Sequence, residues 1–284
     1  VQKLSGSSPL TKISGGAGVS VAVLDTGVSI DHPDLKDRIK DCKDFTLPKQ
    51  AVTDGKCDDK NGHGTHVAGI IAAAGGNDHR GIYGMAPEAS LLIYKTCSNS
   101  GSCWADDVAA ALRIATDNGA QIITMSFGSD GVSSLIADAT AYAADKGVLL
   151  VAAGGNDGPY SGSVDYPAAQ PETVSVGAID AKEIVADWSS RGINGTTKPY
   201  ERNEGDMELV APGVNIESTW KDGGYAIVSG TSMAAPHVAG LAARLWQKDA
   251  ERPADATRDL LHQVTKDLLP EGDDEASGWG LPQP

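Results

Sequence analysis

Aromatic side chains are scarce in this chain. Of its 284 residues only 2 are phenylalanine, and phenylalanine, tryptophan and tyrosine together make up 5%. Glycine, with 34 of the 284 residues, stands well above its usual share of ~7%. The interior must therefore be built from alanine, valine, isoleucine and leucine, with close approaches of the backbone at glycine. Hydrophobic residues at 40% and charged residues at 21% are ordinary for a globular protein and argue against disorder.

Basic residues are also few. The chain has 23 lysines and arginines against 38 acidic residues, which gives a formal net charge of −15. Such a surface repels phosphate backbones, so we expect no nucleic acid among the partners. It keeps the chain soluble and favours cationic ligands.

Long apolar runs are missing. None approaches the ~18 residues of a membrane-spanning helix, so we expect no insertion into a membrane. The first ten residues, VQKLSGSSPL, have no basic segment followed by an apolar one, and we expect no signal peptide in this sequence. A mature secreted chain has already lost its signal and would read the same way.

Cysteine is limited to Cys42, Cys57, Cys97 and Cys103. Four cysteines allow three pairings, and this spacing is not that of a zinc site. Proximity in the sequence favours Cys42–Cys57 and Cys97–Cys103, which would cross-link polar loops in an oxidising, extracellular setting. The alternative is four free thiols in a cytosolic protein.

Short apolar runs alternate with longer helical patterns along the chain. The expected strands are 19–24, 90–95, 120–125, 148–153 and 173–179, and the expected helices are 63–74, 104–119, 133–147, 232–248 and 255–264. Continuous apolar strands between helices predict a three-layer α/β fold, with a mostly parallel central sheet flanked by helices. Parallel sheets carry functional groups at the carboxyl ends of their strands. Asp25, Ser126 and Asn156 follow three of these strands.

Three segments combine reactive side chains with glycine. Asp25 lies in Asp-Thr-Gly, His63 in HGTHVAG and Ser232 in GTSMAAPHVAG. Taken singly, Asp25 could be a turn residue and Ser232 a helix N-cap. His63 and His66 lack the spacing and the glutamate of a helical zinc motif, so we expect His66, like His237, to be structural.

Taken together, the three segments resemble the subtilisin-like serine proteases. Their order, 25, 63 and 232, is the Asp–His–Ser order of subtilisin. SFGS (126–129), AAGGNDG (152–158), VAPG (210–213) and GWGL (278–281) extend the resemblance over nearly the whole chain. It implies a secreted serine endopeptidase with the subtilisin-like fold, formed as a single domain by residues 1–284, a mature chain without its propeptide. The expected partners are protein and peptide substrates and the chain's own propeptide or protein protease inhibitors, and the expected state is a monomer.

The resemblance also assigns catalytic roles. Ser232 would be the nucleophile and His63 the general base and then the general acid, while Asp25 would orient His63. Asn156 would donate a hydrogen bond to the oxyanion, together with the backbone N–H of Ser232. A serine hydroxyl needs such a base, and the tetrahedral oxyanion needs donors already in place.

Substrate contacts follow from the same resemblance. Ser126, Phe127 and Gly128 would pair with an extended substrate backbone, and Ala153, Gly154 and Gly155 would form the opposite wall of the pocket for the side chain before the scissile bond. Asp165 would lie at the base of that pocket and Asp157 at its rim, which favours lysine or arginine there. A short loop before Asp165 could instead turn this carboxylate outward.

Calcium is the cofactor that the resemblance implies. The expected ligands are Asp34, within the sequence HPDL, and Asp78, in the Gly-rich loop 75–81. A second group, Asp54, Asp58, Asp59 and Asn61, could also supply hard oxygen ligands. The alternative for all of these is a set of solvated loop residues.

Two other classes of function compete with a protease. A binding module on an inactive protease scaffold is disfavoured because all four catalytic positions are intact. A dinucleotide-binding oxidoreductase has only the glycines at 15, 16 and 18 in its support. These precede a strand instead of following it, which is the wrong side for a pyrophosphate.

Overall fold

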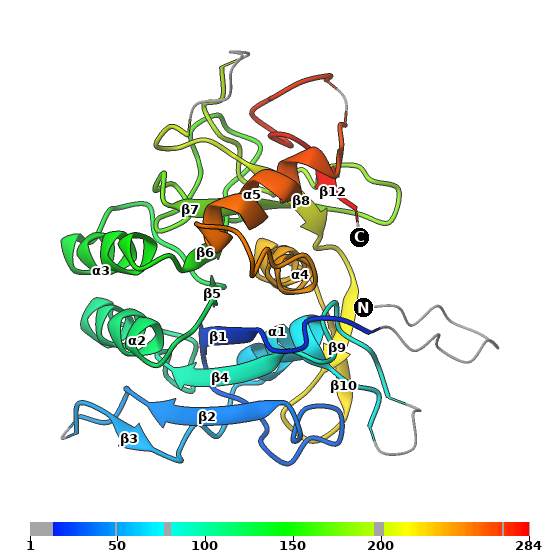
Figure 1. Cartoon of the computed structure of the whole chain (residues 1–284). Helices are drawn as coiled ribbons and strands as arrows, with labels where there is room; N and C mark the ends of the chain where they lie inside the picture. Colours follow the sequence, from blue (N-terminus) through cyan, green and yellow to red (C-terminus); the bar gives the residue numbers. More distant parts are fainter. Residues whose placement is uncertain (1–13, 49, 77–80, 196–201, 269, 284) are drawn as a thin grey trace.

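A computed structural model describes residues 14–48, 50–76, 81–195, 202–268 and 270–283. Its centre is an eight-stranded sheet with the strand order β3-β2-β4-β1-β5-β6-β7-β8 (Figure 1). The strands are β1 Ser20–Asp25, β2 Ile39–Asp44, β3 Thr53–Asp54, β4 Ser90–Lys95, β5 Ile122–Met125, β6 Leu149–Ala153, β7 Thr173–Ile179 and β8 Leu209–Pro212. All neighbours pair in parallel except β2 and β3.

Helices cover both faces of this sheet. They are α1 His63–Ala72, α2 Ala105–Asp117, α3 Ser134–Asp145, α4 Thr231–Arg244 and α5 Pro253–Gln263. Figure 1 shows α2 and α3 on one side of the central strands and α1 and α4 on the other. Each side has its own core of buried apolar residues, mostly alanine, valine, isoleucine and leucine. The predicted three-layer α/β fold is confirmed.

The register of three neighbouring strands positions the carboxyl-end residues. Leu24 of β1 pairs with Met125 of β5, and Met125 pairs with Ala152 of β6. The next residues along these strands, Asp25, Ser126 and Ala153, therefore stand at one level of the sheet. Because the strands are buried and apolar, a slip by one residue would turn core side chains to the wrong face, so this register is strongly specified.

Several strands were not predicted from the sequence. β2, with the sequence IKDCKD, is mostly half-exposed, and β8 is a four-residue edge strand. Two small antiparallel pairs complete the fold, β9 Ile216–Thr219 with β10 Tyr225–Val228 and β11 Thr265–Lys266 with β12 Leu281–Pro282. β2 and β3 have mostly polar sequences, and the remaining strands of this group are only two to four residues long, too short to stand out as apolar runs. Helix α4 also ends at Arg244, four residues before the predicted end at 248.

Both disulfides join the cysteines that lie nearest in the sequence. Cys42, on β2, is bonded to Cys57, which is fully buried in the loop before α1. Cys97 is bonded to Cys103 and closes the loop that follows β4. The described residues leave no cysteine free. Within the same residues, no helix has both the length and the apolar character that crossing a bilayer requires.

We expect the Cys42–Cys57 bond to contribute more stability than the Cys97–Cys103 bond. The two loops span 15 and 6 residues. A loop of 15 residues is worth about 3 kcal/mol in the chain-entropy model, and the shorter loop about 0.8 kcal/mol less. Denaturant unfolding of the Cys42→Ala/Cys57→Ala and Cys97→Ala/Cys103→Ala double variants measures both. A larger loss from the 97–103 pair would contradict the loop-length argument.

Candidate active site

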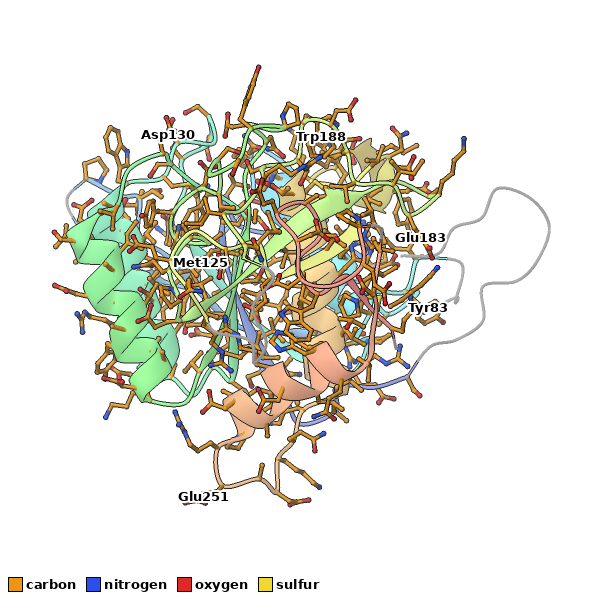
Figure 2. All side chains as sticks on the ribbon, turned by 90° about the horizontal axis from the view of Figure 1, so that it is seen from above. Tyr83, Met125, Asp130, Glu183, Trp188 and Glu251 are labelled. Carbon is orange, nitrogen blue, oxygen red and sulfur yellow. A yellow bond between two sulfur atoms is a disulfide. The ribbon has the colours of Figure 1, made fainter. Side chains whose placement is uncertain are left out.

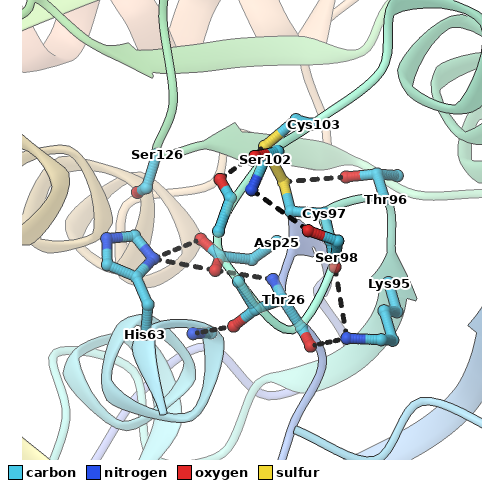
Figure 3. The surroundings of a disulfide bond; sticks show 12 residues. Asp25, Thr26, His63, Lys95, Thr96, Cys97, Ser98, Ser102, Cys103 and Ser126 are labelled. Atoms are coloured by element: carbon cyan, nitrogen blue, oxygen red, sulfur yellow. Dashed lines mark hydrogen bonds and ion pairs between the residues drawn. A yellow bond between two sulfur atoms is a disulfide. The ribbon is translucent and has the colours of Figure 1, made fainter. Parts of the chain in front are cut away.

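Asp25 and His63 form the centre of the site. Asp25 ends β1 and is only 2% exposed. Nδ1 of His63, the first residue of α1, lies 2.8 Å from Oδ1 and 3.0 Å from Oδ2 of this carboxylate (Figure 3). Helix α1 comes this close because of Gly64, where an added Cβ would lie 2.2 Å from the carbonyl oxygen of Gly27. The carboxylate therefore fixes both the tautomer and the orientation of the imidazole.

The charge of Asp25 also changes the acidity of His63. Burial alone would disfavour the imidazolium, but the attraction and hydrogen bond of Asp25 outweigh it, and the pKa of His63 is raised above its usual value. Its side chain keeps 28% of its surface exposed. The ring is thus a base of increased strength, accessible from solvent on its other side.

Asp59 anchors the start of α1. Its carboxylate accepts hydrogen bonds from the backbone N–H groups of Gly62 and Thr65 and from the hydroxyls of Thr26 and Thr65. Burial opposes its ionisation, yet these bonds lower the pKa of Asp59. Such bonds are typical of a carboxylate at a helix N-terminus. The sequence suggested a calcium ligand or a solvated loop residue at Asp59, and gave no sign of this positioning role.

Ser232 lies in the first turn of α4, next to Ser126. Pro236 of the same helix has no N–H, so the carbonyl of Ser232, four residues earlier, lacks an intrahelical donor. The hydroxyl of Ser126 fills that place, donating to Ser232 O at 3.0 Å, and the hydroxyl of Ser232 donates to Ser126 O at 3.1 Å. This reciprocal pair joins α4 to the end of β5. In the first turn the backbone N–H of Ser232 has no intrahelical acceptor and is free for a ligand.

Asn156 is exposed, and its amide is held in one orientation. Its Oδ1 accepts hydrogen bonds from the backbone N–H and the hydroxyl of Thr231, at 3.0 and 3.2 Å. Thr231 directly precedes Ser232. With the oxygen of the amide bound in this way, its NH₂ group is the part left to donate to a ligand beside the serine.

Asp165 lies between two glycine walls. Its backbone N–H donates to the carbonyl of Gly154 at 2.9 Å, and the next residue, Tyr166, exchanges two backbone hydrogen bonds with Ser129. A Cβ added at Gly128 or at Gly155 would lie 2.7 Å from Oδ2 of Asp165. The carboxylate therefore faces the space between 126–128 and 153–155. The outward orientation that the short loop suggested is not observed.

Two further carboxylates stand beside Asp165. Oxygens of Asp130, Asp157 and Asp165 all lie within 4.8 Å of one another. Asp157 follows Asn156, and Asp130 lies in the loop before α3, at the surface of the molecule (Figure 2). Asp130 was missed in the sequence because nothing in its local motif distinguishes it. The fold alone brings it here.

Lys95 binds backbone carbonyls next to the Asp25–His63 pair. This buried residue donates to the carbonyl of Thr26 at 2.5 Å and to that of Cys97 at 3.1 Å, while the backbone N–H groups of Thr96 and Cys97 donate to Asp25 O (Figure 3). The end of β1 is thereby tied to the loop closed by the Cys97–Cys103 bond. A lysine at the end of a strand gave no signal of this role in the sequence.

The remaining histidines of the motifs are structural, as expected. Burial lowers the pKa of His66 to about 4 and that of His237 to about 3, so both are neutral near pH 7. His66 contacts the carbonyls of Ile216 and Ala226 through Nε2, and His237 contacts Met233 O through Nδ1.

The expected calcium ligands are only partly described. Asp34 is buried, and its Oδ2 accepts hydrogen bonds from Ile82 N and from the hydroxyl of Tyr225. Asp78 lies outside the described residues. The second acidic group does not form a common site: besides Asp59, Asp54 pairs with Lys43 and Asp58 with Lys60.

Similar proteins are known for nearly the whole chain. The Subtilase family matches residues 16–280. The chain is 47% identical to "Subtilisin" of Bacillus sp. (strain TA39) over 99% of its own length and 70% of that protein. It is 42% identical to "Subtilisin Savinase" of Lederbergia lenta over 82% of this chain and 78% of that one.

Comparison with solved structures gives the same family. "S41 Psychrophilic Protease" superposes with a TM-score of 0.91 at 47% identity, over 97% of this chain and 94% of that one. "Sphericase" gives 0.92 at 45% identity, over 96% and 94%. An oxidoreductase is not consistent with this set of relatives, and their names favour an enzyme over a binding module on an inactive scaffold. The chain is a serine endopeptidase of the subtilase family.

Proposed function

We propose that this endopeptidase cleaves peptide bonds through an acyl-enzyme formed on Ser232. The observation that carries the proposal is the hydrogen bond from His63 to the buried Asp25, at 2.8 Å. In the attack, the Ser232 hydroxyl gives its proton to Nε2 of His63 while Oγ bonds to the substrate carbonyl carbon. His63 then protonates the leaving amine as the C–N bond breaks. Water, activated by the same imidazole, hydrolyses the ester.

Two N–H donors would stabilise the oxyanion of each tetrahedral intermediate. One is the amide of Asn156, which is supported by the two hydrogen bonds that Thr231 gives to its oxygen. The other is the backbone N–H of Ser232. Both are held in place before the substrate arrives, so little reorganisation is needed as the negative charge develops.

We infer further that the pocket accepts arginine or lysine before the scissile bond. The substrate backbone would lie along Ser126–Gly128, and its side chain would enter between that segment and Ala153–Gly155. The support is the Asp165 carboxylate between these walls, with Asp157 beside it. Gly128 and Gly155 have no side chain to fill the space beside this carboxylate.

Secretion is proposed on the two disulfides, since such bonds form and persist in oxidising compartments. The partners would be protein and peptide substrates and the chain's own propeptide or protein inhibitors. We propose a monomer in which residues 1–284 form one peptidase domain. The two cores that share a single sheet support the single domain.

A structural calcium ion near Asp34 is part of the proposal. The donor chemistry fits, because a carboxylate oxygen is a hard ligand of the kind that calcium binds, and that of Asp34 is buried. When bound, the ion would supply positive charge beside this carboxylate. Asp34 would be its ligand from the described part of the chain.

Ser232→Ala is expected to abolish peptidase activity. Removing the nucleophile lowered kcat by roughly 10⁶ in a subtilisin, and the same scale is expected here. Hydrolysis of a chromogenic peptide measures the loss. The matched control is Ser229→Ala, an exposed serine three residues earlier that accepts a hydrogen bond from Asn215 N. A Ser232→Ala protein that kept a tenth of the activity would refute the assignment.

Asp165→Gly is expected to shift preference from basic to apolar residues. Near pH 7 we expect wild type to cleave after arginine at least as well as after phenylalanine. The variant should lower the Arg/Phe ratio of kcat/KM at least tenfold, the scale of a hydrogen bond to a charged group. High salt screens the net charge of −15 but much less the local carboxylate, so the effect should persist in it. An unchanged ratio in the variant would leave a broad apolar pocket.

Chelation of calcium is expected to lower the melting temperature. A ligand that binds only the folded state stabilises it by about 2.7 kcal/mol when present at 100 times its Kd. Added calcium should restore the melting temperature better than magnesium, which prefers stricter octahedral geometry. Asp34→Asn should remove the response to calcium. Identical melting with and without chelator would end this part of the proposal.

A further inference from the structure

Three segments bring one carboxylate each to the proposed substrate pocket. Asp130 comes from the loop after β5, Asp157 from the loop after β6, and Asp165 from the segment held between the walls. Their oxygens lie within 4.8 Å of one another. Asp130 and Asp157 are exposed and Asp165 is half-buried. We call these three residues the pocket carboxylates.

No basic side chain among the described residues forms an ion pair with any of the three. The neighbours of Asp165 in the walls are Gly128 and Gly155, which have no charged side chain. The charged groups that act on it are Asp157 and Asp130. Like charges so close cannot all ionise without cost, and the half-buried member is the one least able to do so.

Burial and the two neighbouring carboxylates shift the pKa of Asp165 in the same direction. Burial, followed by repulsion from Asp157 and then from Asp130, raises the pKa of Asp165 to about 6. Below that pH its carboxyl group is neutral, and above it the group is ionised. An arginine side chain stays protonated at every pH of interest. An arginine side chain in the pocket would therefore meet a neutral Asp165 at lower pH and a negatively charged Asp165 at higher pH. Both states lie within a mild pH range.

We propose that the pocket carboxylates make the cleavage preference depend on pH, with apolar residues favoured before the scissile bond in mildly acidic solution and arginine or lysine favoured in neutral and alkaline solution. The inference rests on the proposed function. It adds Asp130 as a specificity-determining residue and assigns a regulation to the pocket. A cationic side chain relieves the repulsion among three anions, whereas an apolar side chain fits best when the buried member is neutral.

The test compares two peptides that differ only in arginine or leucine before the scissile bond. The Arg/Leu ratio of kcat/KM is measured from about pH 5 to about pH 8, a range that spans the ionisation of Asp165. Because one enzyme cleaves both peptides, titration of His63 cancels in the ratio. We expect the ratio to rise with pH by about 10- to 100-fold, since each unit by which arginine lowers the pKa of Asp165 is worth a factor of ten.

Three variants identify the groups responsible. Asp165→Asn should make the ratio independent of pH, because the amide does not ionise. Asp130→Asn should move the midpoint to lower pH, because one like charge is removed. Asp249→Asn, in the exposed segment beyond the far end of α4, changes the net charge equally and should alter nothing. Each protein is first titrated with a serine-directed phosphonate, so that only folded, active enzyme is counted.

A wild-type ratio that stays constant over this range, while both peptides are cleaved, would overturn the inference. So would a pH-dependent ratio that persists in Asp165→Asn, or an Asp130→Asn midpoint equal to that of wild type. None of these outcomes touches the proposed acyl-enzyme chemistry. That chemistry fails instead if Ser232→Ala keeps a tenth or more of the wild-type rate on either peptide.

Discussion

Three parallel strands that end at one level of the sheet hold the active site together. β1, β5 and β6 are apolar and fully buried over most of their length, so their mutual register cannot slip without exposing the core. That register determines the positions of Asp25, Ser126 and Ala153. The carboxylate bound to His63, the serine bound to Ser232 and the start of segment 153–155 are thus fixed by the same packing that stabilises the fold.

Two helices supply the other reactive residues of the site. Each helix starts at such a residue or directly before one. α1 starts at His63 and is anchored by Asp59, while α4 starts at Thr231, beside Ser232, and is bound to Ser126. Pro236 has no N–H to donate to the Ser232 carbonyl, so this carbonyl is available to accept the hydrogen bond from Ser126. Polar groups buried at these junctions are hydrogen-bonded to specific partners, which makes the geometry costly to distort.

The sequence predicted those parts of the structure that have a local pattern. Buried strands, long helices, the motifs around Asp25, His63 and Ser232 and the nearest-neighbour disulfides were all visible along the chain. Half-exposed strands such as β2 were not, because they lack an apolar run. Asp130 and Lys95 could not be found either, since their roles depend on which distant loops the fold brings beside them. Asp59 was visible but was misread, because a carboxylate that binds a helix N-terminus and one that binds calcium have the same sequence signal.

Covalent labelling tests the central claim, that Asp25 and His63 activate Ser232. The wild-type protein is treated with a serine-directed phosphonate, and the modified peptide is identified by mass spectrometry. The account predicts one label, on Ser232, and a labelling rate that falls by several orders of magnitude in His63→Ala, on the scale of the ~10⁶ loss known for a subtilisin. A label on another serine, or undiminished labelling of Ser232 without His63, would contradict it.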